Sequence, residues 1–175
     1  MSDPFPEQFP KPSPNHSISI RNDLRPGDVG YITYLHGILY APEQGWDHTF
    51  DAYVALPLAG FAKSHSSRER IWIVEKDARI VGCTAVVNFS EKEAQLRWLL
   101  LDPEIRGQGI GRRLVEEALN FCRYARYSSV FLWTVSTLPT AARLYESAGF
   151  KKTQELTHRL WGSIVTEIKY ELTLK

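Results

Sequence analysis

The sequence is poor in cysteine and contains no long apolar run. Its two cysteines among 175 residues, Cys83 and Cys122, lie far apart and show no CxxC spacing. This pattern excludes a disulfide framework and a cysteine metal site, fits a reducing cytoplasm, and favours both thiols as small core residues. No run of about 18 apolar residues is present, so we expect no transmembrane helix and no membrane partner. The first residues show no basic segment followed by an apolar stretch, so we expect no secretory signal.

An excess of charge of one sign is also missing. Lys and Arg number 21 against 20 Asp and Glu, which gives a net charge of +1. Composition therefore gives no support for a nucleic-acid partner. The hydrophobic share of 43% is ordinary for a globular protein with a sizeable core and excludes a disordered chain.

Proline is concentrated at the start of the chain, where five of the ten prolines fall within the first 14 residues. Proline lacks a backbone N–H and fixes φ, so residues 1–17 are expected to form a flexible tail. A proline-motif ligand is the less favoured interpretation of this segment. Residues 18–175 are expected to form one compact domain.

Hydrophobic periodicity in residues 18–175 predicts a mixed α/β sheet. Pro42 is expected to break the first helix, and Pro57 to interrupt or bend the second. Residues 157–162 are expected to form the loop between the last two strands. Strands are expected at residues 17–22, 71–75, 79–89, 94–101, 129–134, 150–156 and 164–174, and helices at residues 31–40, 46–63, 109–126 and 139–148.

The most informative segment is a glycine-rich turn between a strand that ends near Leu101 and a strongly amphipathic helix. Free N–H groups at a helix N-terminus, with no Cβ in the way, form a cradle for anions. Arg106, Arg112 and Arg113 add positive charge, so the segment predicts a phosphate-bearing ligand. It lacks the Lys-Ser/Thr of a P-loop, and Arg112 stands where a dinucleotide motif needs its third glycine. The alternative is a glycine turn that only caps a helix.

Two motifs resemble the GNAT superfamily of N-acetyltransferases. Residues 106–111, Arg-Gly-Gln-Gly-Ile-Gly, resemble its coenzyme A loop. Residues 141–150 resemble its second motif, a helix carrying Leu-Tyr followed by Gly-Phe, and a predicted strand separates the two motifs. The resemblance implies the GNAT fold, a mixed, mostly antiparallel sheet of six to seven strands with splayed central parallel strands and about four helices.

The resemblance also implies acetyl transfer from acetyl-CoA to a primary amine of a small molecule, peptide or protein, by direct attack on the thioester and without a metal. The pantetheine arm is then expected along the backbone of Leu99 to Leu101, and the pyrophosphate at the glycine loop. Pro139 departs from the Asn with which many relatives contact the cofactor, and that contact is expected either to be replaced by Ser136 or Thr137 or to be absent. The implied cofactor-binding residues are Leu99, Leu100, Leu101, Arg106, Gly107, Gln108, Gly109, Ile110, Gly111, Arg112 and Ser136.

Tyr145 matches the family's tyrosine near the thioester sulfur, where its hydroxyl is expected to act as a general acid. The alternative is a tyrosine that only packs on the sheet. Gln95 stands where many relatives carry a glutamate base, and a glutamine cannot take a proton. The other candidates for the base are Glu93, Asp47, His48, Asp51 and His158, each of which is equally typical of a solvated surface.

Residues 31–63 and the last loop are expected to form the walls of the acceptor site. Tyr40 and Trp46 either enclose a cation or belong to the core. The candidate acceptor residues are Tyr40, Trp46, Asp47, His158 and Trp161.

Residues 36–47 resemble the acetyltransferase half of bacterial proteins that fuse a MarR-type helix-turn-helix domain to a GNAT domain. This chain has no room for that DNA-binding domain, so a free-standing enzyme is expected. The departures at Gln95 and Pro139 leave open a non-catalytic acyl-CoA-binding sensor. The likeness to the fused proteins leaves open a regulatory module. Exposed aromatic residues on the first helices leave a homodimer open.

Overall fold

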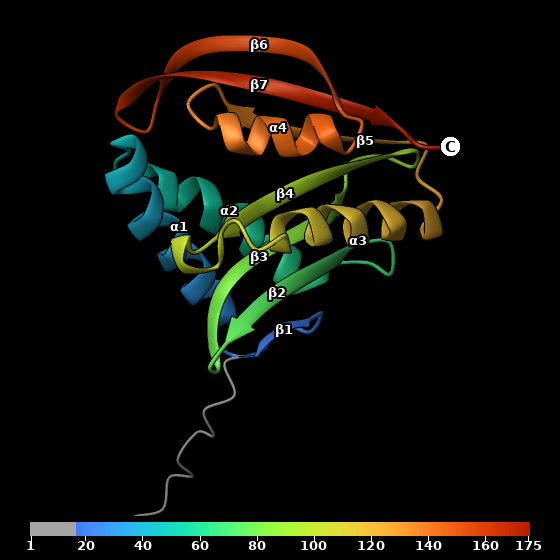
Figure 1. Ribbon diagram of the computed structural model, residues 1–175, viewed down its shortest axis with the longest axis horizontal. Helices are drawn as coiled ribbons and strands as arrows, with labels where there is room; N and C mark the ends of the chain where they lie inside the picture. The colour runs from blue at the N-terminus through green and yellow to red at the C-terminus, as the bar shows by residue number, and fades with distance from the viewer. Residues whose placement is uncertain (1–16) are drawn as a thin grey trace, which may run out of the picture.

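The computed structural model describes residues 17–175, so the predicted tail lies outside the described residues except for Ser17. The described chain forms one seven-stranded sheet in the order β1-β2-β3-β4-β5-β7-β6, with four α-helices on its two faces (Figure 1). β4 and β5 are parallel and the other neighbours are antiparallel, which confirms the predicted fold class. The strands are β1 (Ile18–Arg21), β2 (Arg70–Lys76), β3 (Arg79–Asn88), β4 (Glu93–Leu101), β5 (Ser129–Val135), β6 (Lys151–Leu160) and β7 (Ser163–Thr173). The helices are α1 (Asp28–Gln44), α2 (Thr49–Ser64), α3 (Ile110–Tyr124), α4 (Pro139–Ser147) and the 3₁₀-helix η1 (Pro103–Ile105).

The predicted break at Pro42 is wrong. α1 continues through Pro42, because this proline lies in the last turn, and the helix is capped by Gly45, whose N–H donates to the Ala41 carbonyl at 2.9 Å. α2 continues through Pro57, so this proline does not interrupt the helix, and the expected bend stays a prediction. The predicted loop at residues 157–162 is also wrong for most of its length, because β6 extends to Leu160 and only two residues turn the chain into β7.

Each face of the sheet carries its own hydrophobic core. α3 and α4 cover one face, where Leu114, Ala118 and Tyr145 pack on Leu96 and Leu132. α1 and α2 cover the other face. The second core includes Ile32, Leu35, Val54, Leu58, Trp98 and Val135. We call these the α3/α4 face and the α1/α2 face.

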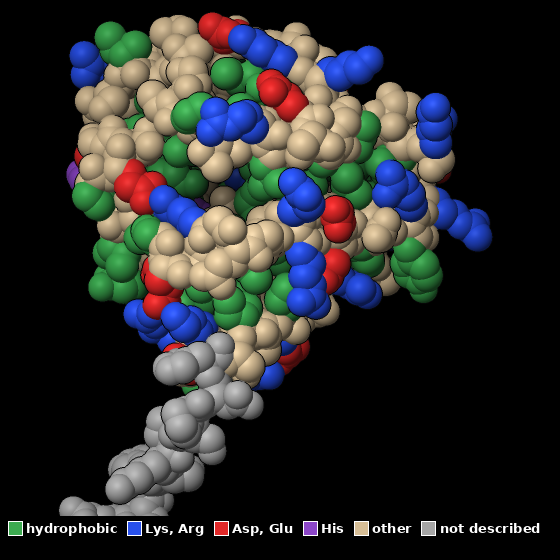
Figure 2. Space-filling model, in the orientation of Figure 1, with side chains coloured by type: hydrophobic (Ala, Val, Ile, Leu, Met, Phe, Trp, Pro, Cys, Tyr) green, Lys and Arg blue, Asp and Glu red, His purple; other side chains and the backbone are tan. Residues whose placement is uncertain are grey.

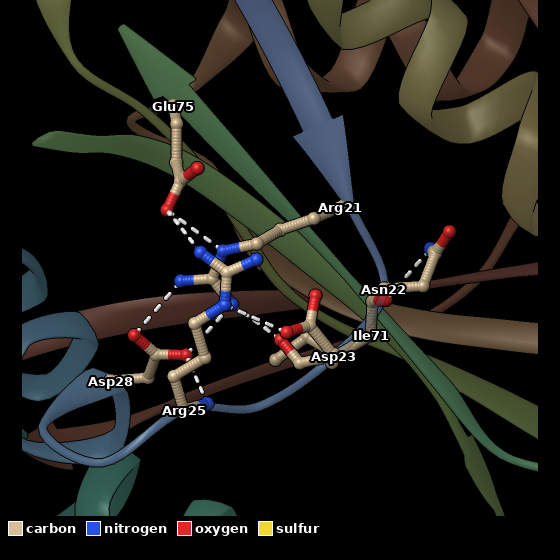
Figure 3. Close-up of polar contacts among 7 residues, drawn as sticks. All are labelled: Arg21, Asn22, Asp23, Arg25, Asp28, Ile71 and Glu75. Atoms are coloured by element: carbon tan, nitrogen blue, oxygen red, sulfur yellow. Dashed lines mark hydrogen bonds and ion pairs between the residues drawn. The ribbon is translucent and has the colours of Figure 1, made fainter. Parts of the chain in front are cut away.

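Ion pairs fasten β1 to the start of α1 and to β2 (Figure 3). Arg21 donates to both carboxylate oxygens of Asp28, at 2.8 and 2.9 Å, and to Glu75 at 2.8 Å. Asp28 is buried in the first turn of α1, where a carboxylate favours the positive end of the helix dipole. Asp28 also accepts the Arg25 N–H at 2.7 Å. The cluster therefore fixes how α1 enters the α1/α2 face.

The parallel strands β4 and β5 separate after only three residue pairs. These pairs are Glu93 with Ser129, Ala94 with Val130 and Gln95 with Phe131. Beyond Gln95, β4 and β5 form no further residue pairs. The peptide groups of β4 on that edge therefore lack strand partners. The middle of the sheet is therefore open in its second half.

A bulge in β4 lies beside this opening. The register with β3 shifts between Cys83 and Ala85, and Trp98 takes a φ of 54°. An extra residue in one strand bends it and re-aims the side chains that follow. Leu96, before the bulge, packs on the α3/α4 face, whereas Trp98 packs on the α1/α2 face.

Candidate active site

A cavity of about 120 Å³ lies where β4 and β5 separate. Leu99, Ala141 and Tyr145 line it from the α3/α4 side of the sheet. Tyr40 and Trp161 line it from the α1/α2 side. The cavity therefore connects the two faces through the opening between the strands, a geometry in which two ligands can meet from opposite sides.

Tyr145 lies on α4 with its side chain in this cavity. It is 6% exposed, and its ring lies 6.0 Å from the ring of Phe150 and 6.2 Å from that of Tyr170. Burial raises the pKa of Tyr145 above its usual value, and the nearby Tyr40 raises it further. The hydroxyl therefore carries its proton at neutral pH and can donate it to an anion that forms in the cavity. Its ring also packs on the sheet. The environment of Tyr145 therefore suits a packing role for the ring and a general-acid role for the hydroxyl.

The glycine loop leads from the end of β4 into α3 and leaves backbone N–H groups free. Gly107 and Gly109 have φ angles of 75° and 81°, and nothing lies within 4 Å of the place that a Cβ would take at either residue. Gly109 precedes α3 without a side-chain cap. Within residues 17–175, the first helical bond runs from Arg113 N–H to Gly109 O at 3.1 Å, and no backbone carbonyl accepts the N–H groups of residues 109–112. Such a cradle suits a phosphate group.

The arginines beside the loop have different surroundings. Arg112 is exposed at the first turn of α3, where its charge is available to an anion. Arg106 instead donates to the Leu101 carbonyl at 2.8 Å and pairs with Glu43 of α1 at 2.9 Å. Arg106 therefore ties the loop to β4 and to α1, and the cradle itself consists of backbone groups and Arg112.

A hollow of about 570 Å³ lies along α3 and α4, beside the same loop. Its lining includes Arg112, Asn120, Arg123 and Ser147. Figure 2 shows Lys and Arg side chains gathered on the face over α3. The hollow continues the positive surface of the loop, so an elongated ligand with several phosphates can lie along it.

Three of the predicted acceptor residues meet on the α1/α2 face. Ring centroids lie 5.1 Å apart for Tyr40 and Trp46, and 4.4 Å apart for Trp46 and Trp161. All three line the cavity, and Phe50 and Tyr53 extend the aromatic lining. Because these rings also pack on one another, they serve as core and as cavity wall at once.

Asp47, His158 and Ser136 do not line the cavity or the hollow. Asp47 accepts the N–H of Thr49 at 3.0 Å, and its own N–H donates to the Trp161 carbonyl at 3.0 Å. His158 Nε2 lies 2.7 Å from Glu167 Oε2. The N–H of Ser136 donates to the Thr166 carbonyl at 2.9 Å. Asp47 and His158 therefore act on the cavity only indirectly. Asp47 does so through Trp161, and His158 through Glu167.

Three polar residues that the sequence did not single out also line the cavity. Glu167 of β7 is the only Asp or Glu in its lining among the described residues. Arg97 has no carboxylate within 4.0 Å in residues 17–175, and burial lowers its pKa. The buried Trp98 Nε1–H has no acceptor in the described chain. In the sequence, Glu167 shares the charged side of an alternating strand with Lys169 and Glu171, so it carries no signal of its own, and the bulge that places Trp98 has none either.

Other chemistries find little support in the described chain. Both cysteines are buried, and burial raises the pKa of each thiol to about 12, so neither is a ready nucleophile. Among residues 17–175, no cluster of three or more His, Cys, Asp and Glu side chains is arranged to hold a metal. No helix in that range has both the length and the apolar surface to cross a membrane.

Comparison with known proteins agrees with this geometry. A model of the acetyltransferase (GNAT) domain matches residues 67–152, which include the glycine loop and α4. Human N-acetyltransferase 8B is 30% identical over 141 residues, which are 77% of this chain and 62% of that protein. The chain thus spans less than two thirds of that relative's length. An uncharacterised N-acetyltransferase of Schizosaccharomyces pombe is 35% identical over 132 residues, which are 72% of this chain and 78% of that protein.

The fold also matches solved structures. An acetyltransferase from Salmonella typhimurium, solved with its cofactor acetyl-CoA, superposes with a TM-score of 0.71 at 17% identity, covering 90% of this chain and 94% of that one. Family model, relatives and fold agree on the same class of protein. The chain belongs to the GNAT family of N-acetyltransferases.

Proposed function

We propose that this protein transfers the acetyl group of acetyl-CoA to a primary amine by direct attack of the amine on the thioester. The observation that carries the proposal is the cavity between β4 and β5, which joins the phosphate cradle side to the aromatic α1/α2 face. The names of the relatives and the acetyl-CoA in the Salmonella typhimurium structure support the same reaction.

The residues of the site fit the cosubstrate. The N–H groups of residues 109–112 and the Arg112 side chain would hold the pyrophosphate. The open edge of β4, which includes Leu99, offers unpaired peptide groups to an extended amide-bearing arm. Acetyl-CoA supplies an activated acyl group with a thiolate as leaving group.

Two side chains at the cavity are suited to move the protons. The amine must lose a proton as its nitrogen bonds to the acyl carbon, and Glu167, which lines the cavity, would accept it. The C–S bond breaks, and the Tyr145 hydroxyl donates its proton to the departing sulfur. His158, bonded to Glu167 at 2.7 Å, would orient that carboxylate. Water returns a proton to Tyr145 after the products leave.

Binding and turnover with a matched pair of glycine variants test the proposal. Gly109→Ala places a methyl group in the cradle, whereas Gly27→Ala introduces a methyl group at a φ of 96° far from it. Both changes strain the backbone, by about 1 kcal/mol. Calorimetry should show acetyl-CoA binding to the wild type and to Gly27→Ala, and binding at least about 10-fold weaker for Gly109→Ala. Failure of the wild type to bind acetyl-CoA would refute the proposal.

A sensor that binds acyl-CoA without catalysis is the second candidate, and Gln95 is the observation that favours it. Gln95 lines the cavity but cannot take a proton. The resemblance of residues 36–47 to MarR-fused acetyltransferases favours a further candidate of this kind, a regulatory module. Release of the free thiol from acetyl-CoA in the presence of primary amines separates an enzyme from both.

We further propose a cytoplasmic location and a homodimer. The exposed apolar side chains Tyr34, Ile38 and Leu56 on α1 and α2 support self-association of this face. Light scattering of the purified chain tests the dimer, and a mass equal to 20.0 kDa at working concentration would contradict it.

A further inference from the structure

We propose that the amine acceptor is an α-amino acid with an apolar side chain, whose carboxylate is recognised by Arg97 and Trp98 and whose ammonium group lies at Glu167. This inference rests on the proposed function and specifies its substrate. It starts from the two donors in the cavity lining that lack an acidic partner.

Arg97 is the first of these donors. Its guanidinium is partly buried, which lowers its pKa, and no carboxylate lies within 4.0 Å of it among residues 17–175. Its neighbours are the rings of Trp98 and Tyr53, whose centroids lie 5.1 and 5.9 Å from Cζ. Partly buried arginines are normally paired, because removing a charge from water is costly. The guanidinium also shares a side-chain hydrogen bond with Tyr53. Arg97 thus has a neutral partner in the cavity but no anionic one among residues 17–175.

Trp98 provides the second donor. It is 8% exposed, and its Nε1–H is buried without an acceptor in the described chain. An indole nitrogen donates one hydrogen bond, and leaving a buried donor without a partner is unfavourable. The bulge of β4 places Arg97 and Trp98 next to each other in the lining. A carboxylate has the charge for Arg97 and enough lone pairs for both donors.

Glu167 supplies the opposite charge. Its side chain is 15% exposed and lines the same cavity from β7. Burial is the main cause of the raised pKa of Tyr53, and both charges also act on its hydroxyl, since Arg97 lowers that pKa and Glu167 raises it. The two opposite charges therefore act on one small space, and an α-amino acid carries its ammonium and carboxylate on a single carbon.

The rest of the lining selects the body of the acceptor. Trp46, Phe50 and Trp161 form an aromatic wall on the α1/α2 face. This wall favours an apolar side chain, and the volume of about 120 Å³ favours a small molecule. The unpaired charge of Arg97 disfavours a polyamine, because a second ammonium group in this space would be repelled.

A set of matched amines tests the inference. The probes are L-leucine, its neutral amide L-leucinamide, its decarboxylated analogue 3-methylbutylamine, and spermidine. With acetyl-CoA saturating, kcat/KM for L-leucine should exceed that for the amide and the amine by about 10-fold or more, since a charge-assisted pair contributes that much. Calorimetry of the CoA-loaded protein should give the same order of affinity without turnover. An equal or higher value for the amide or for spermidine would overturn the inference.

Variants distinguish recognition from folding. Arg97→Gln and Trp98→Phe should each raise KM for L-leucine by about 10-fold or more and change kcat/KM for 3-methylbutylamine by less than about threefold. Arg159→Gln, which removes an exposed charge on β6, is the control and should change neither. Equal losses for both acceptors would mean a structural role and overturn the inference.

The inference and the proposed function fail in different ways. If the protein acetylates amines without regard to a carboxylate, only the acceptor class is refuted. If no amine yields free thiol although acetyl-CoA binds, the enzymatic function itself is refuted.

Discussion

Tyr145 combines a buried ring with a hydroxyl at the cavity, and its raised pKa keeps the proton in place until a base appears. Tyr145→Phe removes only that hydroxyl. We expect kcat to fall by about 100-fold, a typical contribution of a general acid, while the Kd for acetyl-CoA stays within about twofold of the wild type. Thiol release and calorimetry measure the two quantities. Wild-type turnover in the variant would show that Tyr145 only packs.

His36 predicts how stability depends on pH. Its ring is buried, and its Nδ1 lies 2.8 Å from the Ile32 carbonyl oxygen. Burial lowers the pKa of His36 from 6.5 to about 4. The unfolded chain therefore binds a proton that the folded chain refuses, so the stability from this residue is complete above pH 6.5 and is lost as the pH falls toward 4.

Urea unfolding at pH 7 and pH 4.5 measures this effect. The loss attributable to His36 should grow as the pH falls from 6.5 and approach about 3 kcal/mol below the folded-state pKa of about 4, so most of it is present at pH 4.5. His36→Gln keeps a donor for Ile32 and should show a shallower decline with acid than the wild type. Identical slopes in the two proteins would contradict the assignment.

At the scale of the elements, the cluster around Arg21 joins β1, α1 and β2. Arg21→Gln leaves the buried carboxylate of Asp28 without its cation and leaves Glu75 only the more distant Arg25, at 4.0 Å. We expect the free energy of unfolding to fall by about 3 kcal/mol, because breaking a buried pair leaves an uncompensated charge. Denaturant unfolding provides the measurement.

Arg25→Gln is the matched control for this cluster. Arg25 pairs with Asp23 at 2.7 Å, where both side chains are more than half exposed, and lies 4.0 Å from Glu75. Surface pairs contribute about 1 kcal/mol or less. A loss as large as that of Arg21→Gln would show that burial does not govern these pairs.

The order of the elements could be predicted from the sequence because each has a strong local signal. The amphipathic stripe of α3 and the alternation of β7 lie within a few residues of chain. Pro42 misled the prediction, because a proline in the last turn disturbs a helix less than one in its interior. The extent of β6 was underestimated because its residues are polar and exposed, so they carry no apolar alternation.

The candidate site was predictable where a motif carries it and, on the acceptor side, for the aromatic residues Tyr40, Trp46 and Trp161, which line the cavity. The glycine loop and Tyr145 lie within two contiguous motifs, and both take part in the geometry described above. Arg97, Trp98 and Glu167 come together through a bulge in β4 and through the pairing of β7 with β5. Neither the bulge nor the strand pairing can be predicted from the local periodicity of the sequence. Only the tertiary structure brings these three residues together.

At the scale of the whole molecule, the two ligands are expected to approach from opposite faces of one sheet and meet in its opening. Neither thiol is available as an intermediate carrier, because burial raises the pKa of each to about 12. We therefore predict a sequential mechanism with both substrates bound together. Initial rates against acetyl-CoA at several amine concentrations should give intersecting lines, and mass spectrometry should find no acetylated protein. Parallel lines would point to an acetyl-enzyme instead.

The three-pair contact between β4 and β5 also has a mechanical meaning. It divides the sheet into a four-stranded half, β1 to β4, and a three-stranded half of β5, β7 and β6. Only three residue pairs join the two halves. A ligand that pairs with the open edge of β4 would add contacts between the two halves of the sheet. As the cosubstrate concentration rises and the site fills, the two halves of the sheet would be held together more firmly.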